Sequence, residues 1–137
     1  MTIRGLTRWP LWRRWFGTRA ERAAERFLRR RGCKVLGRNI RLPMGELDLV
    51  VLDGEVIAFV EVRSTEGNAV RPMQSVDNVK QKKLSDLAVA WLQRNHLLGR
   101  AVRFDVIAVS WPAGQREPQI NHYPAAFEAT SRFQMYS

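Results

Sequence analysis

Two acidic side chains stand inside otherwise apolar runs in the segment 45–63, GELDLVVLDGEVIAFVEVR. These acids are Asp48 and Glu61. Carboxylates are rarely buried unless they are paired, hydrogen-bonded or bound to a metal. Oxygen ligands of this kind suit a hard divalent cation, so the segment predicts a site for Mg²⁺ or Mn²⁺. The alternative is a solvated sheet face, but the apolar runs favour strands covered on both faces, as in an α/β sheet.

The segment is predicted to form a β-hairpin, because an Asp-Gly pair between apolar runs favours a tight turn. If Asp53 and Gly54 are the two central turn residues, Asp48 pairs with Phe59. Glu61 is then a diagonal neighbour of Asp48, at roughly 7–8 Å. Side chains alternate along a strand, so both acids lie on one face, together with Arg63.

A helix is predicted over residues 18–31, where apolar residues recur at helical spacing and arginines occupy the other side. Thr18 and Glu21 form a capping box at its start. Glu21 also borders the apolar stripe of this helix. We therefore expect Glu21 to cap the helix and also to reach a site beneath it.

A second helix is predicted over residues 76–95, with Ser75 or Asp77 as its cap. Lys80 and Lys83 fall within its apolar arc. A lysine there usually carries its ammonium group out to solvent. The other interpretation is that Lys80 extends toward the acidic hairpin, and both remain open. Further strands are predicted over 33–39, 101–110 and 119–123.

The charge is strongly positive and unevenly distributed. The 137 residues carry a net charge of +10 and a sequence pI near 11.2. Residues 1–41 hold thirteen Lys/Arg and two acids, whereas the remainder is close to neutral. A basic region of this kind points to a polyanion, and charge alone does not separate nucleic acid from an anionic membrane surface. The residues expected to contact nucleic acid are Arg19, Arg22, Arg26, Arg38 and Lys83.

Three parts are expected: a basic Trp/Arg-rich extension (1–16), one folded domain (17–128) and a tail (129–137). A chain of this length can bury a core of its own. The single cysteine excludes an internal disulfide and a Cys-based zinc site. No apolar run reaches 18 residues and the basic N-terminus lacks the apolar core of a secretory signal, so a cytoplasmic protein is expected, with no membrane span.

The sequence resembles the YraN family within the restriction-endonuclease-like, PD-(D/E)xK nuclease superfamily. The similarity rests on AERAAERFLRRRGCKVLGRN (20–39), the hairpin segment (45–63), VKQKKLSDLAVAWL (79–92) and VRFDVIAVSW (102–111). It implies an α/β fold with a restriction-endonuclease-like core, in which helices flank a mixed central sheet. It also implies likeness to Holliday-junction resolvases, which cut branched DNA with a divalent metal and act as dimers.

The resemblance implies roles for individual residues. Glu21, Asp48 and Glu61 match the acids that hold the metal, and Glu61-Val62-Arg63 matches the E-x-K motif. Arginine replaces the expected motif lysine. Arg63 can grip a phosphate but cannot act as a general base. We therefore expect Lys80 to supply the missing catalytic cation.

Three functions follow as hypotheses. The leading one is a metal-dependent endonuclease-like protein that acts on branched or structured DNA. The second is a non-catalytic nucleic-acid-binding protein that retains the nuclease fold, which the arginine at position 63 favours. The third is an adaptor that uses residues 1–16 on a membrane surface or a partner, which is the least favoured. No small-molecule cofactor is expected, and a homodimer is compatible with the family resemblance.

Overall fold

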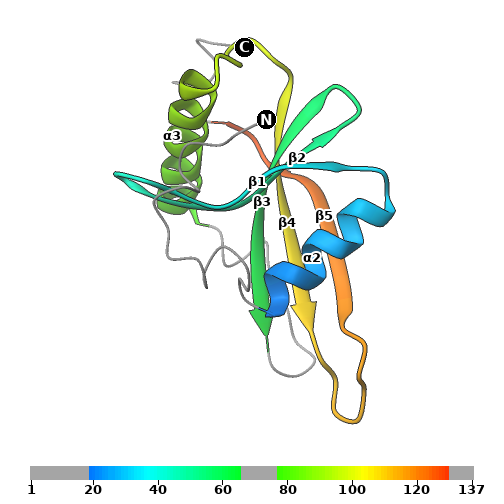
Figure 1. The fold of residues 1–137 in the computed structure, drawn as a ribbon. Helices are drawn as coiled ribbons and strands as arrows, with labels where there is room; N and C mark the ends of the chain where they lie inside the picture. The colour runs from blue at the N-terminus through cyan, green and yellow to red at the C-terminus, as the bar shows by residue number, and fades with distance from the viewer. Residues whose placement is uncertain (1–18, 66–76, 130–137) are drawn as a thin grey trace.

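The computed structural model describes residues 19–65 and 77–129. They form a mixed five-stranded sheet with strand order β1-β2-β3-β4-β5 and a helix on each side (Figure 1). The elements in chain order are α2 (Arg19–Arg30), β1 (Lys34–Leu42), β2 (Gly45–Asp53), β3 (Val56–Thr65), α3 (Asn78–Arg94), β4 (Val102–Ser110) and β5 (Gln119–Phe127). β3 and β4 are parallel and α3 lies in the connection between them, whereas the other neighbouring strands are antiparallel. The predicted α/β class with a mixed, helix-flanked sheet is confirmed.

Helix α2 packs on one face of the sheet because its small apolar residues share one side. Ala20, Ala23, Ala24 and Leu28 are all buried and meet apolar residues of β2, β3 and β4. The helix ends at Gly32, which has a φ of +91°. There the N–H groups of Gly32 and Cys33 donate to the carbonyl groups of Arg29 and Leu28, which is the Schellman arrangement that glycine favours.

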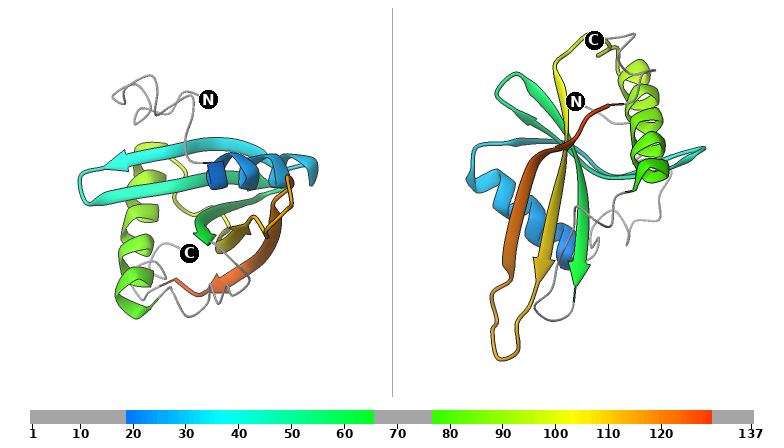
Figure 2. Two further views of the ribbon diagram at one scale, coloured as in Figure 1. Left: turned by 90° about the horizontal axis from the view of Figure 1, so that it is seen from below. Right: turned by 180° about the vertical axis from the view of Figure 1, so that it is seen from behind.

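Helix α3 covers the opposite face, so the sheet lies between the two helices (Figure 2). Asp77 caps the helix, and its carboxylate accepts a 2.9 Å hydrogen bond from the N–H of Lys80. This confirms the predicted cap. Leu84, Leu87 and Trp91 are buried against the sheet, and the ring of Trp91 meets Phe59 of β3 edge-on, with centroids 5.7 Å apart.

The predicted hairpin is present, but its register is wrong by two residues. Asp53 pairs with Val56, so Gly54 and Glu55 are the central turn residues. Gly54 has a φ of +62° and Glu55 does not have a positive φ. A turn that needs a positive φ at its first central position takes glycine there, and this explains the shift. Because the shift is an even number of residues, the paired side chains of the two strands keep the faces that alternation predicts.

Strand β5 is longer than predicted and runs through Pro124 to Phe127. It is an edge strand of the sheet, where proline is tolerated because one side of the strand needs no hydrogen-bond donor. Helix α2 ends at Arg30, one residue before the predicted end, and α3 begins at Asn78 and ends at Arg94, within the predicted range 76–95. The predicted extension (1–16), the capping role of Thr18 and nearly all of the predicted tail lie outside the described residues. Neither of the two described helices is long and apolar enough to cross a membrane.

Candidate functional site

The candidate site lies where β2 separates from β3. The paired residues of the two strands end at Leu49 and Val60. Beyond that point β2 continues with β1 as a two-stranded ribbon (Figure 1). The carboxylate of Asp48 accepts a 2.9 Å hydrogen bond from the backbone N–H of Val62, which places it at the point where the strands part. Asp48 and Glu61 are thus the first residues beyond the paired stretch, one on each strand.

The electrostatic environment of Asp48 opposes its ionisation. Burial raises the pKa of this carboxyl to about 8, with further contributions from the charges of Glu61, Glu21 and Glu46, against the hydrogen bond from the Val62 N–H. Three acids thus act on one half-buried carboxyl group. A raised pKa with a specific charge neighbour is typical of functional sites. The structure therefore brings Asp48, Glu61 and Glu21 into one electrostatic neighbourhood.

The carboxylate of Glu61 is contacted by two basic side chains. It is buried, with 9% of its surface exposed, and its side chain is on the α3 face of the sheet. Lys80, in the first turn of α3, places its Nζ 2.7 Å from Glu61 Oε1. Arg63 lies two residues along β3 on the same face, with a guanidinium nitrogen 3.6 Å from the same oxygen. The predicted approach of Lys80 to the acidic hairpin is confirmed, whereas its chemical role is not tested by this contact.

A cavity of about 10 Å³ adjoins these acids. Its lining includes Asp48 and Glu61 with the apolar side chains of Phe59, Leu84 and Phe104. About 10–15 Å³ is the smallest volume that holds one water molecule. The cavity therefore fits a single small ligand such as an ion or a water, and a macromolecular substrate would have to approach from the surface.

The donor chemistry of this site fits a divalent cation. Asp48 and Glu61 offer the carboxylate oxygens that Mg²⁺ prefers, and Mg²⁺ usually takes only one or two carboxylates. A dication next to Asp48 would also relieve the repulsion that raises its pKa. Within the described ranges, no three His, Cys, Asp or Glu side chains gather closely enough to hold a metal ion. Glu21 as a third ligand stays a prediction.

The residues expected to contact DNA lie mainly on the outer side of α2. Arg19, Arg22 and Arg26 are exposed there, and the guanidinium of Arg19 stacks on the ring of Trp111 at 4.0 Å. Arg38 of β1 pairs with Glu25 at 2.8 Å. The side chains of Arg19, Arg22 and Arg26 are therefore at the surface of the protein, and the charge of Arg38 is partly neutralised by Glu25.

Lys83 was predicted within the apolar arc of the second helix, but it is exposed. Its aliphatic stem lies beside Gly45, where an added Cβ would be 3.0 Å from Lys83 Cε. The close packing of α3 on the start of β2 explains both observations, because the stem covers the glycine and the ammonium group can reach solvent. Exposure is compatible with the predicted DNA contact.

Sequence reasoning missed a second polar cluster, on the α2 face of the sheet. Asp105 of β4 is fully buried and accepts hydrogen bonds from Arg103 Nε at 3.0 Å and from the Ala125 N–H at 3.0 Å. His122 Nε2 lies 2.9 Å from Asp105 Oδ2. The available signal was a lone acid inside the apolar run AVRFDVIAVS. His122 looked isolated because its partner is on the neighbouring strand.

This protein is an α/β domain with a mixed sheet between two helices and an acidic pair contacted by a lysine. The chain belongs to the uncharacterised protein family UPF0102, whose model matches residues 20–109. This confirms the family recognised above as YraN.

Family relatives from several bacteria match most of the chain. A UPF0102 protein of Anaeromyxobacter dehalogenans is 42% identical over 85% of this chain and 86% of its own length. One of Geobacter metallireducens is 42% identical over 82% of this chain and 91% of its own length. Among solved structures, Pyrococcus furiosus SfsA in complex with Ca²⁺ is similar over 77% of this chain and 60% of that chain, with 15% identity and a TM-score of 0.31.

Proposed function

We propose that this protein is a metal-dependent endonuclease that hydrolyses phosphodiester bonds in branched or structured DNA. The observation that carries the proposal is the contact of Lys80 with Glu61 beside Asp48, whose pKa is raised to about 8. Two acids and a cation from a third element meet at one point. The segment Glu61–Arg63, which resembles the E-x-K motif, also supports the proposal.

Asp48 and Glu61 are the residues that would hold the metal. When bound there, Mg²⁺ or Mn²⁺ supplies Lewis-acid chemistry and lowers the pKa of a water molecule. Asp48 is held in place by its hydrogen bond from Val62 N–H. The burial of Glu61 limits competing water, which strengthens the interactions of its carboxylate.

Lys80 and Arg63 divide the task that a single motif lysine performs in the resembled nucleases. The ammonium group of Lys80 is fixed by Glu61 and stabilises negative charge that develops on the phosphate oxygens. Arg63 grips a phosphate oxygen pair through its planar guanidinium. Glu21 orients the attacking water from the α2 side. The exposed arginines of α2 bind the DNA backbone, because phosphate contacts position a protein without reading sequence.

The test is a cleavage assay with the full chain, Mg²⁺ or Mn²⁺, and single-stranded, duplex, flap and four-way-junction DNA. Metal-dependent cutting of the branched substrates is expected. Asp48→Ala and Glu61→Ala should abolish it. Glu55→Gln is the matched control, because Glu55 is an exposed acid at the turn of the same hairpin. Equal cutting by the parent and by Asp48→Ala would mean that the activity comes from elsewhere.

A non-catalytic nucleic-acid-binding protein is the second candidate. It is favoured by Arg63 in the place of the motif lysine and by the ion pair that already neutralises Glu61. This candidate predicts DNA binding without cleavage under any metal condition. It also predicts that Glu61→Gln leaves DNA affinity unchanged and that Arg63→Lys produces no activity.

A further inference from the structure

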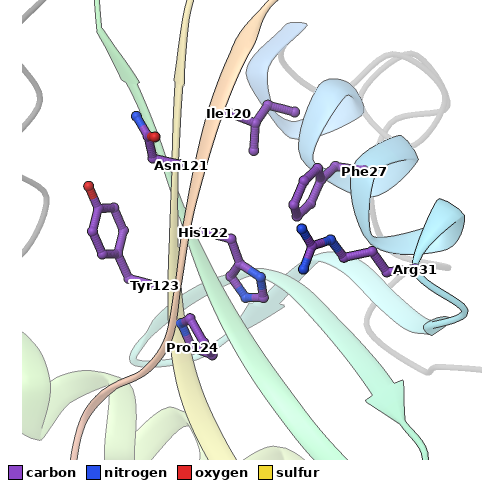
Figure 3. A pocket seen from close by; sticks show the side chains of 7 residues that line it. All are labelled: Phe27, Arg31, Ile120, Asn121, His122, Tyr123 and Pro124. Atoms are coloured by element: carbon purple, nitrogen blue, oxygen red, sulfur yellow. The ribbon is translucent and has the colours of Figure 1, made fainter.

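A hollow of about 270 Å³ lies at the sheet edge, between the C-terminal end of α2 and β5 (Figure 3). Its volume approaches the range of about 300–1,000 Å³ that is typical of small-molecule sites. The cavity beside Asp48 and Glu61 shares no lining residue with this hollow, although Asp105, which lines that cavity, contacts His122. The residues that line it are Phe27, Arg31, Ile120, Asn121, His122, Tyr123 and Pro124.

The buried carboxylate of Asp105 holds the ring of His122 in this hollow. Burial raises the pKa of Asp105, but the hydrogen bonds from His122 and Arg103 outweigh it and hold the pKa below its usual value. Asp105 is therefore an ionised acceptor, so His122 Nε2 carries the proton in their 2.9 Å contact. This bond orients the ring and leaves Nδ1 as the nitrogen that can accept a hydrogen bond from a ligand.

The hollow favours an anion. None of its seven lining residues is acidic. Behind His122, Arg103 pairs with Asp105 at 3.0 Å and also with Asp53 at 2.9 Å. Arg31 brings a guanidinium group to the rim, stacked 4.5 Å from the centre of the Phe27 ring. A planar guanidinium of this kind binds phosphate through two parallel hydrogen bonds.

The hollow is also larger and more apolar than a phosphate requires. The Phe27 ring meets His122 edge-on, with centroids 5.8 Å apart, and Ile120 and Pro124 complete an apolar wall. Aromatic side chains and guanidinium planes are the groups on which proteins stack unpaired bases. The side chains of Asn121 and Tyr123 lie on the other side of β5 from Phe27, Arg31 and His122 (Figure 3).

We propose that the hollow between α2 and β5 binds one unpaired nucleotide of a DNA strand, with Arg31 on the phosphate and the base against Phe27, Ile120 and Pro124. The identity of the natural ligand rests on the proposed action on structured DNA. Such DNA contains unpaired nucleotides at its branch points. The site would hold one of these away from the acids that face α3, and would thereby favour branched over plain duplex substrates.

The test is an NMR titration of the full chain in EDTA at constant ionic strength, with thymidine 5′-monophosphate, thymidine or inorganic phosphate. The nucleotide should shift the resonances of Phe27, Arg31 and His122, and should bind at least about fivefold more tightly than either fragment. Arg31→Ala and Phe27→Leu should each weaken it at least about fivefold. Arg30→Ala is the matched control, because Arg30 is the adjacent exposed arginine and does not line the hollow.

Two outcomes would overturn the inference. Equal affinity for phosphate and the nucleotide would leave only an anion site. Equal losses of nucleotide affinity in Arg30→Ala and Arg31→Ala would show that the binding depends on the overall positive charge of α2 and not on the hollow. The experiment contains no divalent ion and measures no cleavage, so its result is independent of the nuclease proposal. If the protein binds the nucleotide but cleaves no DNA in any metal condition, the proposed nuclease activity is contradicted and the nucleotide site is still supported.

Discussion

Lys80 Nζ lies 2.7 Å from Glu61 Oε1, so the first turn of α3 is joined to the acidic strand β3 across the face of the sheet. Both side chains are largely covered, with 35% of the Lys80 and 10% of the Glu61 side chain exposed. The pair connects the α3 helix to the point where β2 and β3 separate. Protein variants at this contact are therefore the most informative tests of the proposed activity.

Lys80→Ala should slow DNA cleavage by at least about tenfold, roughly 1.4 kcal/mol of activation free energy, because the cation nearest Glu61 is removed. DNA affinity should change little, since one ammonium among many basic groups is lost. Single-turnover rates and binding isotherms measure the two effects separately. Lys82→Ala is the control, because Lys82 is exposed and pairs with Asp86 at 3.1 Å. A Lys80→Ala protein that cuts at the parental rate would contradict the assigned role.

Arg63→Lys should retain or increase the cleavage rate. The substitution restores the lysine of the E-x-K pattern on the same sheet face as Glu61, and a lysine in that position can approach the nucleophilic water more closely than the broad guanidinium group. The rate with a four-way junction in Mg²⁺ is the measurement. Loss of cleavage in Arg63→Lys, with unchanged DNA binding, would show that the bidentate guanidinium is needed for the reaction.

Asp48→Asn should make stability less dependent on pH. Because the pKa of Asp48 is about 8 in the folded protein, the folded state keeps a proton that the unfolded chain releases above the ordinary pKa of 3.8. The free energy of unfolding of the parent should therefore fall as pH rises from about 4 to about 8. Asn keeps an oxygen acceptor for the Val62 N–H and carries no charge, so the variant should gain stability over the parent chiefly at pH 8–9.

Urea denaturation at several pH values measures this difference. The control is Glu55→Gln, which removes an exposed acid from the same hairpin and should leave the pH dependence of the parent intact. A stability difference between Asp48→Asn and the parent that stays constant from pH 5 to pH 9 would show that Asp48 is ionised at the lower pH.

DNA binding should weaken steeply with salt and should not require the acids. Each phosphate contact contributes roughly −0.9 to the slope of log K against log salt. Arg26→Ala should make this slope shallower, because Arg26 is exposed on the basic side of α2. Arg100→Ala, in the loop after α3, is the control.

Removal of residues 1–16 should weaken DNA binding modestly, since nine of the thirteen basic residues in 1–41 lie beyond this segment. Salt-independent affinity would show that this region is not the DNA-binding surface.

The sequence by itself determined the elements and the face on which the acids lie. The alanine stripe of α2, the Asp77 cap of α3 and the Asp-Gly turn are local features, and local features follow from propensity and periodicity. Asp48 and Glu61 were assigned correctly to one neighbourhood even though the register was wrong. The reason is that side chains alternate with a period of two, so an even shift preserves the face.

Which side chains meet depends on how the elements pack together in three dimensions. The turn residues depend on which positions accept a positive φ, and Gly54 took the first central position instead of the second. The 2.7 Å contact of Lys80 depends on how closely α3 packs on the sheet, which no helical pattern specifies. Asp105 and His122 are seventeen residues apart and meet only because β5 pairs with β4. Contacts between elements are set by packing in three dimensions, so a linear pattern can place a residue on a face but cannot choose its partner.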